Sequence, residues 1–530
     1  MDGWHFINIL KKISYCTVFI FCALLFSSSC AFSIENNAVI TKNSEAVFSM
    51  EDCINYALEN NPNIKIFKQK QQAQKSMVGL QKSNYFPSLF GGTGYKINNT
   101  DYSGNLNGSV NNNYYQINLG VNQLIWDFGR TNAKINMQKF NYEAAGYDLD
   151  YQVLDTVYNV KIAYASVLAA RANEDIYQRS VKINQLNYER TNALYEEGLK
   201  SRIDVVNAEV YLTNAKIDLL EAQNQYQTAI IVLNNSMYYI DAPDYKIKNT
   251  ENFNFQSDYS ERNEIDVANV HQKFDKNIGE GAILTSGIEK RDIIKDYKFN
   301  SCPLSFQEAI KKAYENRPDL KSLMLVKNAS EESLKAIKKA YMPSVNASAG
   351  YSYQNGNDLA TKGLGLYAGV DLPSVNAMAI KYQIDQGKSY LDIAVNNIDY
   401  SKKNIYFEVQ NYYVNMNLLE KRIPLMSQKI GQTLENFELA DGRYTVGLGN
   451  FIELQQAQTN YNNAQLAFVQ SVFNYNRARF YFEKSMGMND YKIPEISVSN
   501  TKIKSKAKLK MLPEIRLKNQ TKLKTQEGTK

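Results

Sequence analysis

The chain contains two copies of one sequence plan. Residues 49–95 align without gaps with residues 305–351, and residues 120–237 align with residues 369–486. The offset is 256 residues in the first block and 249 in the second, so the first copy is the longer one between its two blocks. Self-similarity on this scale means that each half folds as a similar unit. Identical pairs include Pro62 and Pro318, Pro87 and Pro343, Gly94 and Gly350, Tyr195 and Tyr444, Gly198 and Gly447, Leu199 and Leu448, and Ile203 and Ile452.

Each copy opens with a serine followed three residues later by an acid. This is the spacing of a capping box, in which the two side chains satisfy the first free N–H groups of a helix. We expect a helix to run from there to a proline, with an earlier proline marking a break and a restart. In order, these residues are Ser49, Asp52, Pro62 and Pro87 in the first copy and Ser305, Glu308, Pro318 and Pro343 in the second.

After the prolines the hydrophobic period changes from about 3.6 to 2. This predicts two strands per copy, each about ten residues long, with one apolar and one polar face; the Asn-, Gly- and Ser-rich residues 98–113 predict a longer turn in the first copy. Such strands can cross a bilayer at a tilt, but a small closed barrel needs about eight of them. Either the hairpins pack on the helices or several chains share one barrel. The residues that would then face lipid are Tyr115, Ile117, Leu119, Val121, Val345, Ala347, Ala349, Leu366, Ala368 and Val370.

A very long helical segment follows the strands. In the first copy we expect it from Arg130 to Glu196, about 100 Å at 1.5 Å per residue. In the second copy an apolar residue recurs every seven residues, as in the seam of a coiled coil, and Pro424 predicts a kink or a break. The seam residues are Ile384, Leu391, Ile398, Ile405, Tyr412 and Leu419.

Both long helices turn back at a Gly-Leu pair and return as a second helix. The return helix starts after a serine or an asparagine that is followed, at capping distance, by an acid. The copies therefore occupy residues 49–237 and 305–487, and we expect the polar residues 238–304 to form a partly disordered insert. The reversal residues are Gly198, Leu199, Ser201 and Asp204 in the first copy and Gly447, Leu448, Asn450 and Glu453 in the second.

The first 31 residues have the pattern of a cleavable signal peptide. Lys11 and Lys12 precede an apolar stretch and then small residues, which favours cleavage after Ala31 over lipidation at Cys30. No later run of 18 apolar residues exists, so an integral membrane protein would have to cross as strands. After cleavage the remaining cysteines are Cys53 and Cys302, either two buried thiols or one disulfide.

Charge and side-chain chemistry exclude several functions. Residues 501–530 hold ten Lys or Arg and two Glu, which predicts a basic, disordered tail over residues 488–530. Because the excess positive charge lies in this tail, the body of the chain is no nucleic-acid binder. The two histidines, His5 and His271, lie in the signal peptide and the insert. No residues have metal-ligand spacing and no phosphate-binding loop follows a strand, so we expect no cofactor and no enzyme activity.

The succession of helix, hairpin, long helix, reversal and return helix resembles the TolC-like outer-membrane efflux proteins. The resemblance covers about residues 49–237 and 305–487, and its motifs lie at residues 58–62, 85–89, 125–130, 195–199 and 444–448. It implies a mainly α fold with a β-barrel part: in a homotrimer, each chain gives four strands to one twelve-stranded barrel in the outer membrane of a Gram-negative bacterium, continued by a periplasmic helical tunnel. One departure puts a barrel-to-helix turn in doubt, because Asn376-Ala377-Met378-Ala379 stands where the first copy has Asp127-Phe128-Gly129-Arg130.

The resemblance also implies a function. Such a trimer is a passive exit duct for efflux or type I secretion, which docks to a periplasmic adaptor protein and an inner-membrane pump. A Val-Gly-Leu tip that meets the adaptor is matched by Val446, Gly447 and Leu448, and by Gly198 and Leu199 without the valine. The alternative is that these glycines only end helices and the leucines staple the turns.

At the periplasmic aperture of the family, a tyrosine and an arginine on one hairpin tie to an aspartate on the other, and two acidic rings guard the pore. Tyr444 and Asp204 match the tyrosine and the aspartate, and Glu453 matches one ring acid, whereas Gly449 replaces the arginine and Gln456 the second acid. This predicts a weaker lock, although capping alone would explain both acids. The alternative for the whole chain is an exported coiled-coil structural or adhesion protein without a channel.

Overall fold

The computed structural model describes residues 46–102, 108–242, 245–250, 304–356, 359–373, 376–489 and 491. The predicted signal peptide, Cys302, most of the insert and nearly all of the basic tail lie outside these residues. The chain divides into a small and a large unit. The small unit holds most of a two-stranded sheet made of β1 (Ala46–Phe48) and β4 (Tyr245–Ile247), and the large unit holds all the other described elements.

The predicted helix starts and proline breaks are confirmed. In the first capping box the Asp52 N–H donates to Ser49 Oγ (3.2 Å) and the Ser49 N–H donates to the Asp52 carboxylate (2.9 Å); Ser305 and Glu308 repeat both bonds. A proline then divides each opening helix in two. The resulting helices are α2 (Met50–Asn60) and α3 (Pro62–Ser83) in the first copy, and α7 (Phe306–Asn316) and α8 (Pro318–Lys338) in the second.

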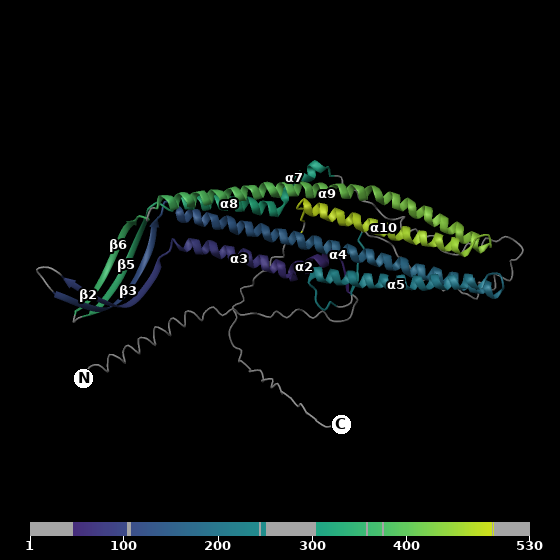
Figure 1. Ribbon diagram of the computed structural model, residues 1–530, viewed down its shortest axis with the longest axis horizontal. Helices are drawn as coiled ribbons and strands as arrows, with labels where there is room; N and C mark the ends of the chain where they lie inside the picture. Colours follow the sequence, from purple (N-terminus) through teal and green to yellow (C-terminus); the bar gives the residue numbers. More distant parts are fainter. Residues whose placement is uncertain are drawn as a thin grey trace, which may run out of the picture. The chain divides into compact units, whose positions relative to one another are not determined.

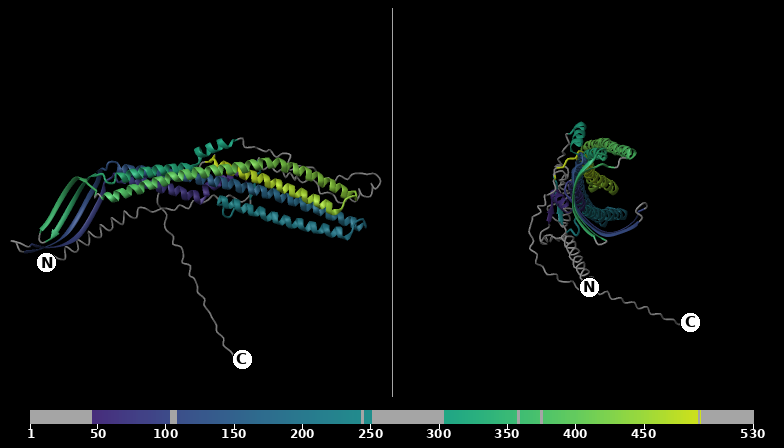
Figure 2. Two further views of the ribbon diagram at one scale, coloured as in Figure 1. Left: turned by 45° about the horizontal axis from the view of Figure 1, so that its top comes forward. Right: turned by 90° about the vertical axis from the view of Figure 1, so that its left-hand side faces the viewer.

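The four long strands form one antiparallel sheet in the order β2-β3-β5-β6. They are longer than the ten residues expected: β2 (Ser88–Tyr102), β3 (Gly108–Trp126), β5 (Ser344–Gly356) and β6 (Leu359–Asp371). The extra residues of the first copy were expected in its turn, but most of them extend the β2–β3 ladder, which pairs as far as Tyr102 and Gly108. The end-on view in Figure 2 shows that the sheet is curved.

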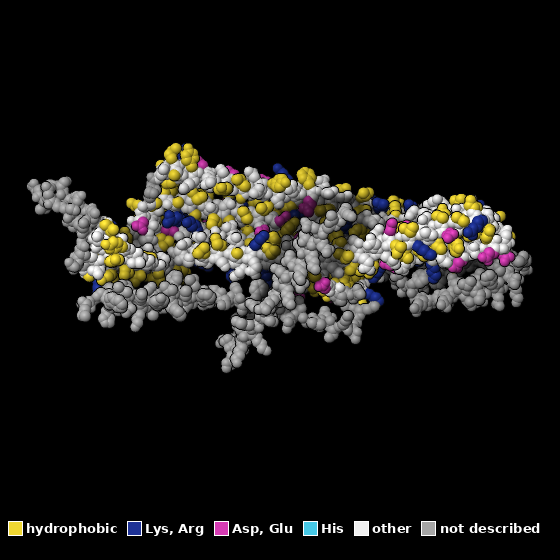
Figure 3. Space-filling view, turned by 60° about the horizontal axis from the view of Figure 1, so that its bottom comes forward, with side chains coloured by type: hydrophobic (Ala, Val, Ile, Leu, Met, Phe, Trp, Pro, Cys, Tyr) yellow, Lys and Arg dark blue, Asp and Glu magenta, His cyan; other side chains and the backbone are white. Residues whose placement is uncertain are grey.

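The register places most of the apolar residues of the four strands on one face, with Phe90 and Tyr367 on the other. Leu89, Val121, Ala349 and Leu366 form one cross-strand row, and all ten residues predicted to face lipid lie on the same face as this row. The outermost members are open to solvent in the single chain, since Leu89 and Leu366 are 83% and 82% exposed. Figure 3 shows hydrophobic side chains gathered over the sheet, and the opposite face carries mainly Asn, Ser, Gln and Gly.

The first long helix has the predicted bounds, and both return helices start where the caps predicted. α4 spans Arg130–Glu196 and returns as α5 (Arg202–Met237), and α9 spans Ala377–Thr445 and returns as α10 (Phe451–Ser485). Pro424 predicted a kink or a break, and the break is wrong because α9 continues through this residue. Pro424 lies on the exposed side of α9, so the carbonyl group that loses its helix partner can reach water.

The predicted heptad seam of α9 holds only for its first part. Ile398 and Ile405 are buried, but beyond them the buried positions move four residues along the helix. An α-helix drifts by about 20° per heptad relative to a strict seven-residue repeat, and α9 also changes its partner from α8 to α10. The buried positions of the second part are Val409, Met416, Ile423, Ile430, Phe437 and Tyr444.

Both turns from the sheet into a long helix are capped, including the one that the sequence left in doubt. In the first copy the buried Asp127 carboxylate accepts from the N–H groups of Gly129 (3.1 Å) and Thr131 (2.7 Å). Asn376 occupies the corresponding position in the second copy, and its side-chain oxygen accepts from Met378 and Ala379, both at 3.1 Å. The change from Asp to Asn therefore conserves the helix start.

The helices form a layer whose members change along its length. Near the sheet the order across the layer is α3, α4, α8, α9, and near the reversals it is α5, α4, α10, α9. Figure 1 shows the sheet at one end of the large unit and both reversals at the other. α9 is the last long helix on one side, with the short helix α7 packed against it over part of its length, and the opposite edge is formed by α3 and then by α5.

Candidate functional site at the two hairpin tips

The two reversals have the same backbone. We call residues 195–204 the first tip and residues 444–453 the second tip. Gly198 (φ 73°) and Gly447 (φ 79°) are left-handed, and the next residue donates its N–H back to the third-last helical carbonyl: Leu199 to Leu194 (2.8 Å) and Leu448 to Arg443 (2.9 Å). This is the Schellman motif, which ends a helix with a glycine at the left-handed position.

The surroundings of the glycines differ. A Cβ at Gly198 or Gly447 would meet no atom within 4 Å. These glycines are therefore needed for the positive φ of the turn and not to avoid a steric clash. A Cβ at Gly449 would come within 3.0 Å of the Tyr444 backbone nitrogen. The residue that replaces the expected arginine is therefore a glycine that lets the second tip close tightly.

Both tips present apolar side chains to solvent. Leu199 is 70% exposed and Leu448 is 77% exposed, and Val446 beside Gly447 is also open. The exposed set further includes Ile203 and Ile452, two residues that the docking prediction did not contain. The signal for them was present in the sequence, since they are an identical pair in the two copies. Each tip is thus a small apolar surface at the end of a hairpin.

Tyr444 binds a partner other than the one expected. Its ring is buried, its hydroxyl lies 3.0 Å from Thr191 Oγ1 on α4, and Lys200 stacks over the ring at 4.6 Å. Asp204 instead closes a capping box with Ser201, whose hydroxyl donates to it at 2.7 Å. Burial raises the pKa of Tyr444, and the Asp204 charge adds to this rise. The expected bond between Tyr444 and Asp204 is therefore replaced by one between Tyr444 and Thr191, because α9 turns Tyr444 toward α4.

A second tie between the hairpins was missed from the sequence. The Arg190 guanidinium on α4 lies 3.0 Å from the Asp441 carboxylate and donates to Thr445 Oγ1 at 3.1 Å. Both charged residues lie within two turns of a reversal, but they are not counterparts in the two copies. No pattern in the sequence pairs them, since their proximity depends on how α4 and α9 are rotated.

The remaining aperture residues lie on the exposed surface of α10. Glu453 sits 3.6 Å from Arg443 across the second tip, so its charge has a counter-ion in its own hairpin. Asn450 caps the helix by accepting from the Glu453 N–H (2.6 Å), which leaves the Glu453 side chain free of the cap. Gln456 donates to Asn460 (3.1 Å) on the same helix. The second hairpin thus carries one acid, Glu453, where the family has two, because Gln456 stands at the second position.

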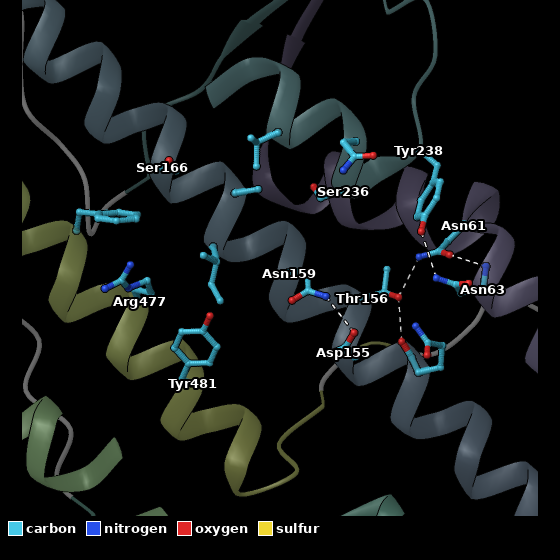
Figure 4. A pocket seen from close by; sticks show the side chains of 16 residues that line it. Asn61, Asn63, Asp155, Thr156, Asn159, Ser166, Ser236, Tyr238, Arg477 and Tyr481 are labelled. Carbon is cyan, nitrogen blue, oxygen red and sulfur yellow. Dashed lines mark hydrogen bonds between the residues drawn. The ribbon is translucent and has the colours of Figure 1, made fainter. Parts of the chain in front are cut away.

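A polar pocket of about 450 Å³ lies between α4, α5, α10 and the junction of α2 with α3. Figure 4 shows that its polar groups bind one another: Asn61 donates to Thr156 (3.1 Å), Asn63 to Tyr238 (3.1 Å) and Asn159 to Asp155 (3.0 Å). Asp155 also pairs with Lys484. The polar groups of this pocket therefore join helices and show no catalytic arrangement.

The sequence matches one protein family over both copies. The model of the family described as "Outer membrane efflux protein" covers residues 53–237 and 309–487. The chain belongs to this family. It is accordingly a transport protein of the outer membrane, and the predicted localisation is confirmed.

Known relatives of this efflux protein agree. The "Probable efflux pump outer membrane protein TtgC" of Pseudomonas putida is 20% identical over 428 residues, which is 79% of each chain. The outer membrane protein TolC of Escherichia coli is 23% identical over 164 residues, which is 29% of this chain and 33% of TolC. The solved Campylobacter jejuni CmeC outer membrane channel has a TM-score of 0.63 at 16% identity and covers 87% of this chain and 90% of its own. The predicted mainly α fold is confirmed.

The described residues of this efflux protein lack two features that other functional classes would need. None of its helices there is long and apolar enough to span a membrane. No group of three His, Cys, Asp or Glu side chains in the same residues could hold a metal ion.

Proposed function

We propose that three copies of the chain form one exit duct through the outer membrane. The observation that carries this proposal is the four-stranded sheet with one exposed apolar face and two free edges, β2 and β6. Free edges and a bare apolar face are unfavourable in water, and four strands are too few to close a barrel. Three curved sheets joined edge to edge would give twelve strands, with lipid outside and the polar face around the duct.

Aromatic side chains support the placement in lipid. The rings of Tyr95 and Tyr115 contact each other at one end of the apolar face, with centroids 4.7 Å apart and planes tilted by 45°. Trp126 and Phe128 make an edge-to-face contact at the other end, with centroids 6.2 Å apart. From Tyr115 to Trp126 the strand covers about 36 Å, or roughly 25 Å across a membrane when tilted by about 45°. This equals the height of the apolar band between the two aromatic girdles of an outer-membrane barrel.

The helical layers then form a periplasmic tunnel that ends at the tips. Six tips per trimer would present Leu199, Val446 and Leu448 with their glycines to a periplasmic adaptor, which connects the duct to an inner-membrane pump. The bond of Tyr444 to Thr191 and the pair of Arg190 with Asp441 hold the two hairpins of each chain together near this end. The duct itself is passive, and the pump supplies the energy.

The membrane part of the proposal is tested by comparing the two faces of the sheet. Outer membranes are extracted with mild detergent, and the chain is run on gels with and without heating. We expect a heat-sensitive band of three chains. Leu366→Arg should weaken this band, because an arginine on the lipid face at mid-bilayer destabilises the folded barrel by about 2–4 kcal/mol. Asn118→Arg on the polar face should leave the band intact. A monomer in the soluble fraction would favour the coiled-coil structural protein instead.

The docking part is tested with a photo-cross-linking residue at position 448. Ile240 serves as the control position, because it is 83% exposed and lies at the end of α5 away from the tips. We expect a cross-link to a periplasmic protein from position 448 and none from position 240. Trimers that cross-link equally from both positions, or from neither, contradict docking at the tips.

A further inference from the structure

The edges of the helical layer near the sheet are α3 and α9. α3 packs against α4, α4 against α8 and α8 against α9, while α7 packs against α9 from Lys402 onward, where Tyr314 donates to the Lys402 carbonyl. Between its start and Asp399, one side of α9 has no helix packed on it within the described residues, and the same holds for one side of α3. The same two helices lead into β2 and out of β6, the free edges of the sheet. A second copy of the chain would bring α3 of one copy beside α9 of the next.

The free side of α3 carries one basic and one apolar stripe. α3 contains five lysines and no acid, and Lys68, Lys75 and Lys82 recur every seven residues at exposed positions. Seven residues are close to two helical turns, so the three charges lie in one row. The apolar stripe, which lies on the other flank, consists of the exposed residues Ile66, Met77 and Leu80.

The free side of α9 has the complementary arrangement. Gly387 and Ala394 are buried on the side that meets α8. Away from them, Asp385, Asp392 and Asp399 recur every seven residues at exposed positions and form an acidic row. The flank beyond this row carries an exposed apolar row with the same spacing, made of Ile393, Tyr400 and Phe407.

The handedness of the two helices aligns these rows. α3 runs toward the sheet and α9 runs away from it, so from the sheet end the residues of α9 progress clockwise and those of α3 progress counter-clockwise. At about 100° per residue, the lysine row and the aspartate row then fall on the same side of the layer when the two edges meet. The two apolar rows fall together on the other side.

The repeat fixes the height of the contact. A Cβ on Gly387 would touch Leu334 and Ile337 of α8, whose counterparts on α3 are Val78 and Gln81. Asp385, two residues before Gly387 on a helix that runs the other way, is therefore level with Lys82. The remaining pairs follow by steps of seven residues on both helices.

The chain already contains one contact of this kind. α4 and α8 are the repeat counterparts of α9 and α3, and they pack against each other within the chain. In that contact burial raises the pKa of Asp150, and the charge of Lys321 opposes the rise. The counterparts of this pair are Asp399 and Lys65, and Lys65 lies one turn from Lys68 on the same side of α3.

We propose that α9 of one chain packs against α3 of the next chain through a ladder of three pairs, Asp385 with Lys82, Asp392 with Lys75 and Asp399 with Lys68. This inference rests on the trimer proposed above and adds the surface that joins its subunits and sets their register. The middle pair is the best probe. Asp385 already contacts Lys388 on its own helix, whereas neither Lys75 nor Asp392 has an ion-pair partner within the described residues.

The first test is a cross-link between chains. Lys75→Cys and Asp392→Cys are combined in one chain and treated in membranes with a short bismaleimide. We expect covalent dimers and trimers that survive heating, and only background from either single variant, which controls for Cys302. The matched control combines Asp392→Cys with Lys70→Cys, since Lys70 lies about 140° around α3 from Lys75.

The outcomes separate this inference from the proposed function. A heat-sensitive trimer that gives no 75–392 cross-link, or that cross-links as well from position 70, overturns the ladder and leaves the duct standing. A cross-link from 75 to Asp399→Cys in place of 392 overturns the register. Absence of any trimer overturns both proposals.

The second test exchanges the charges. Lys75→Asp alone and Asp392→Lys alone should each lower the fraction of trimer that survives a given heating step, and the exchange of both residues should restore it. Lys70→Asp is the control and should leave the fraction unchanged. Equal loss in the exchanged and the single variants would contradict a direct pair.

Discussion

The two tips share a backbone and differ in what their side chains do. Tyr195 and Tyr444 are counterparts in the repeat, yet Tyr195 is 39% exposed and Tyr444 is 1% exposed. The acids differ in the same way, since Asp204 is used within its own capping box and Glu453 is not. Duplication therefore preserved the turn, which local sequence determines, and the side chains around it diverged. One tyrosine became a core residue that holds the two hairpins of a chain together.

The largest effect should separate the two tyrosines. Tyr444→Ala should lower the free energy of unfolding by about 3–5 kcal/mol, the range for truncating a large buried aromatic residue. Tyr195→Ala should change it by less than about 0.5 kcal/mol, as for a surface substitution. Denaturant unfolding in detergent measures both values, and equal losses would mean that the two tips are not specialised.

The glycines should instead behave alike. Gly198→Ala and Gly447→Ala should each cost about 1–2 kcal/mol, because a left-handed backbone is unfavourable once a Cβ is present and no other atom is in its way. Thermal unfolding of the two variants tests this. A loss of stability in only one of the two variants would contradict the view that the left-handed glycine has the same role in both tips.

Tyr444→Phe isolates the hydroxyl group. It should cost about 1 kcal/mol at neutral pH, the net value of one hydrogen bond. Since the pKa of Tyr444 is raised in the folded state, its contribution is complete below the unfolded value of about 10 and is lost as the pH rises above it. The free energy of unfolding of the wild type should therefore fall more steeply between pH 8 and 11 than that of Tyr444→Phe. Parallel pH curves for the two proteins would contradict this.

The smallest effect on stability is expected at the acid of the second tip. Glu453→Gln removes an exposed pair with Arg443 and should cost at most about 1 kcal/mol. In a trimer it also removes three carboxylates near one axis, so block of the channel by multivalent cations from the tip side should weaken. Asp204→Asn is the comparison variant. If it changes the block more than Glu453→Gln does, then Asp204 is the acid that faces the channel and the assigned roles are reversed.

Local signals in the sequence were sufficient for the elements. Alternation of apolar and polar residues predicted the faces of β3, β5 and β6, and caps such as Ser49 with Asp52 predicted the helix starts. Contacts between elements were less predictable, because a small drift per heptad accumulates over α4 and α9. The seam beyond Ile405, the partner of Tyr444 and the pair of Arg190 with Asp441 all depend on that accumulated rotation. Pro424 is a case in which the local signal was misleading, because α9 continues through this proline.

The central claim is that three chains enclose one continuous duct. The most direct test is the ion current through a planar lipid bilayer after addition of the purified, heat-sensitive trimer. The account predicts discrete conductance steps that appear with the trimer and are absent when the same sample has been heated to monomers. A trimer that inserts into the bilayer and passes no current would contradict it.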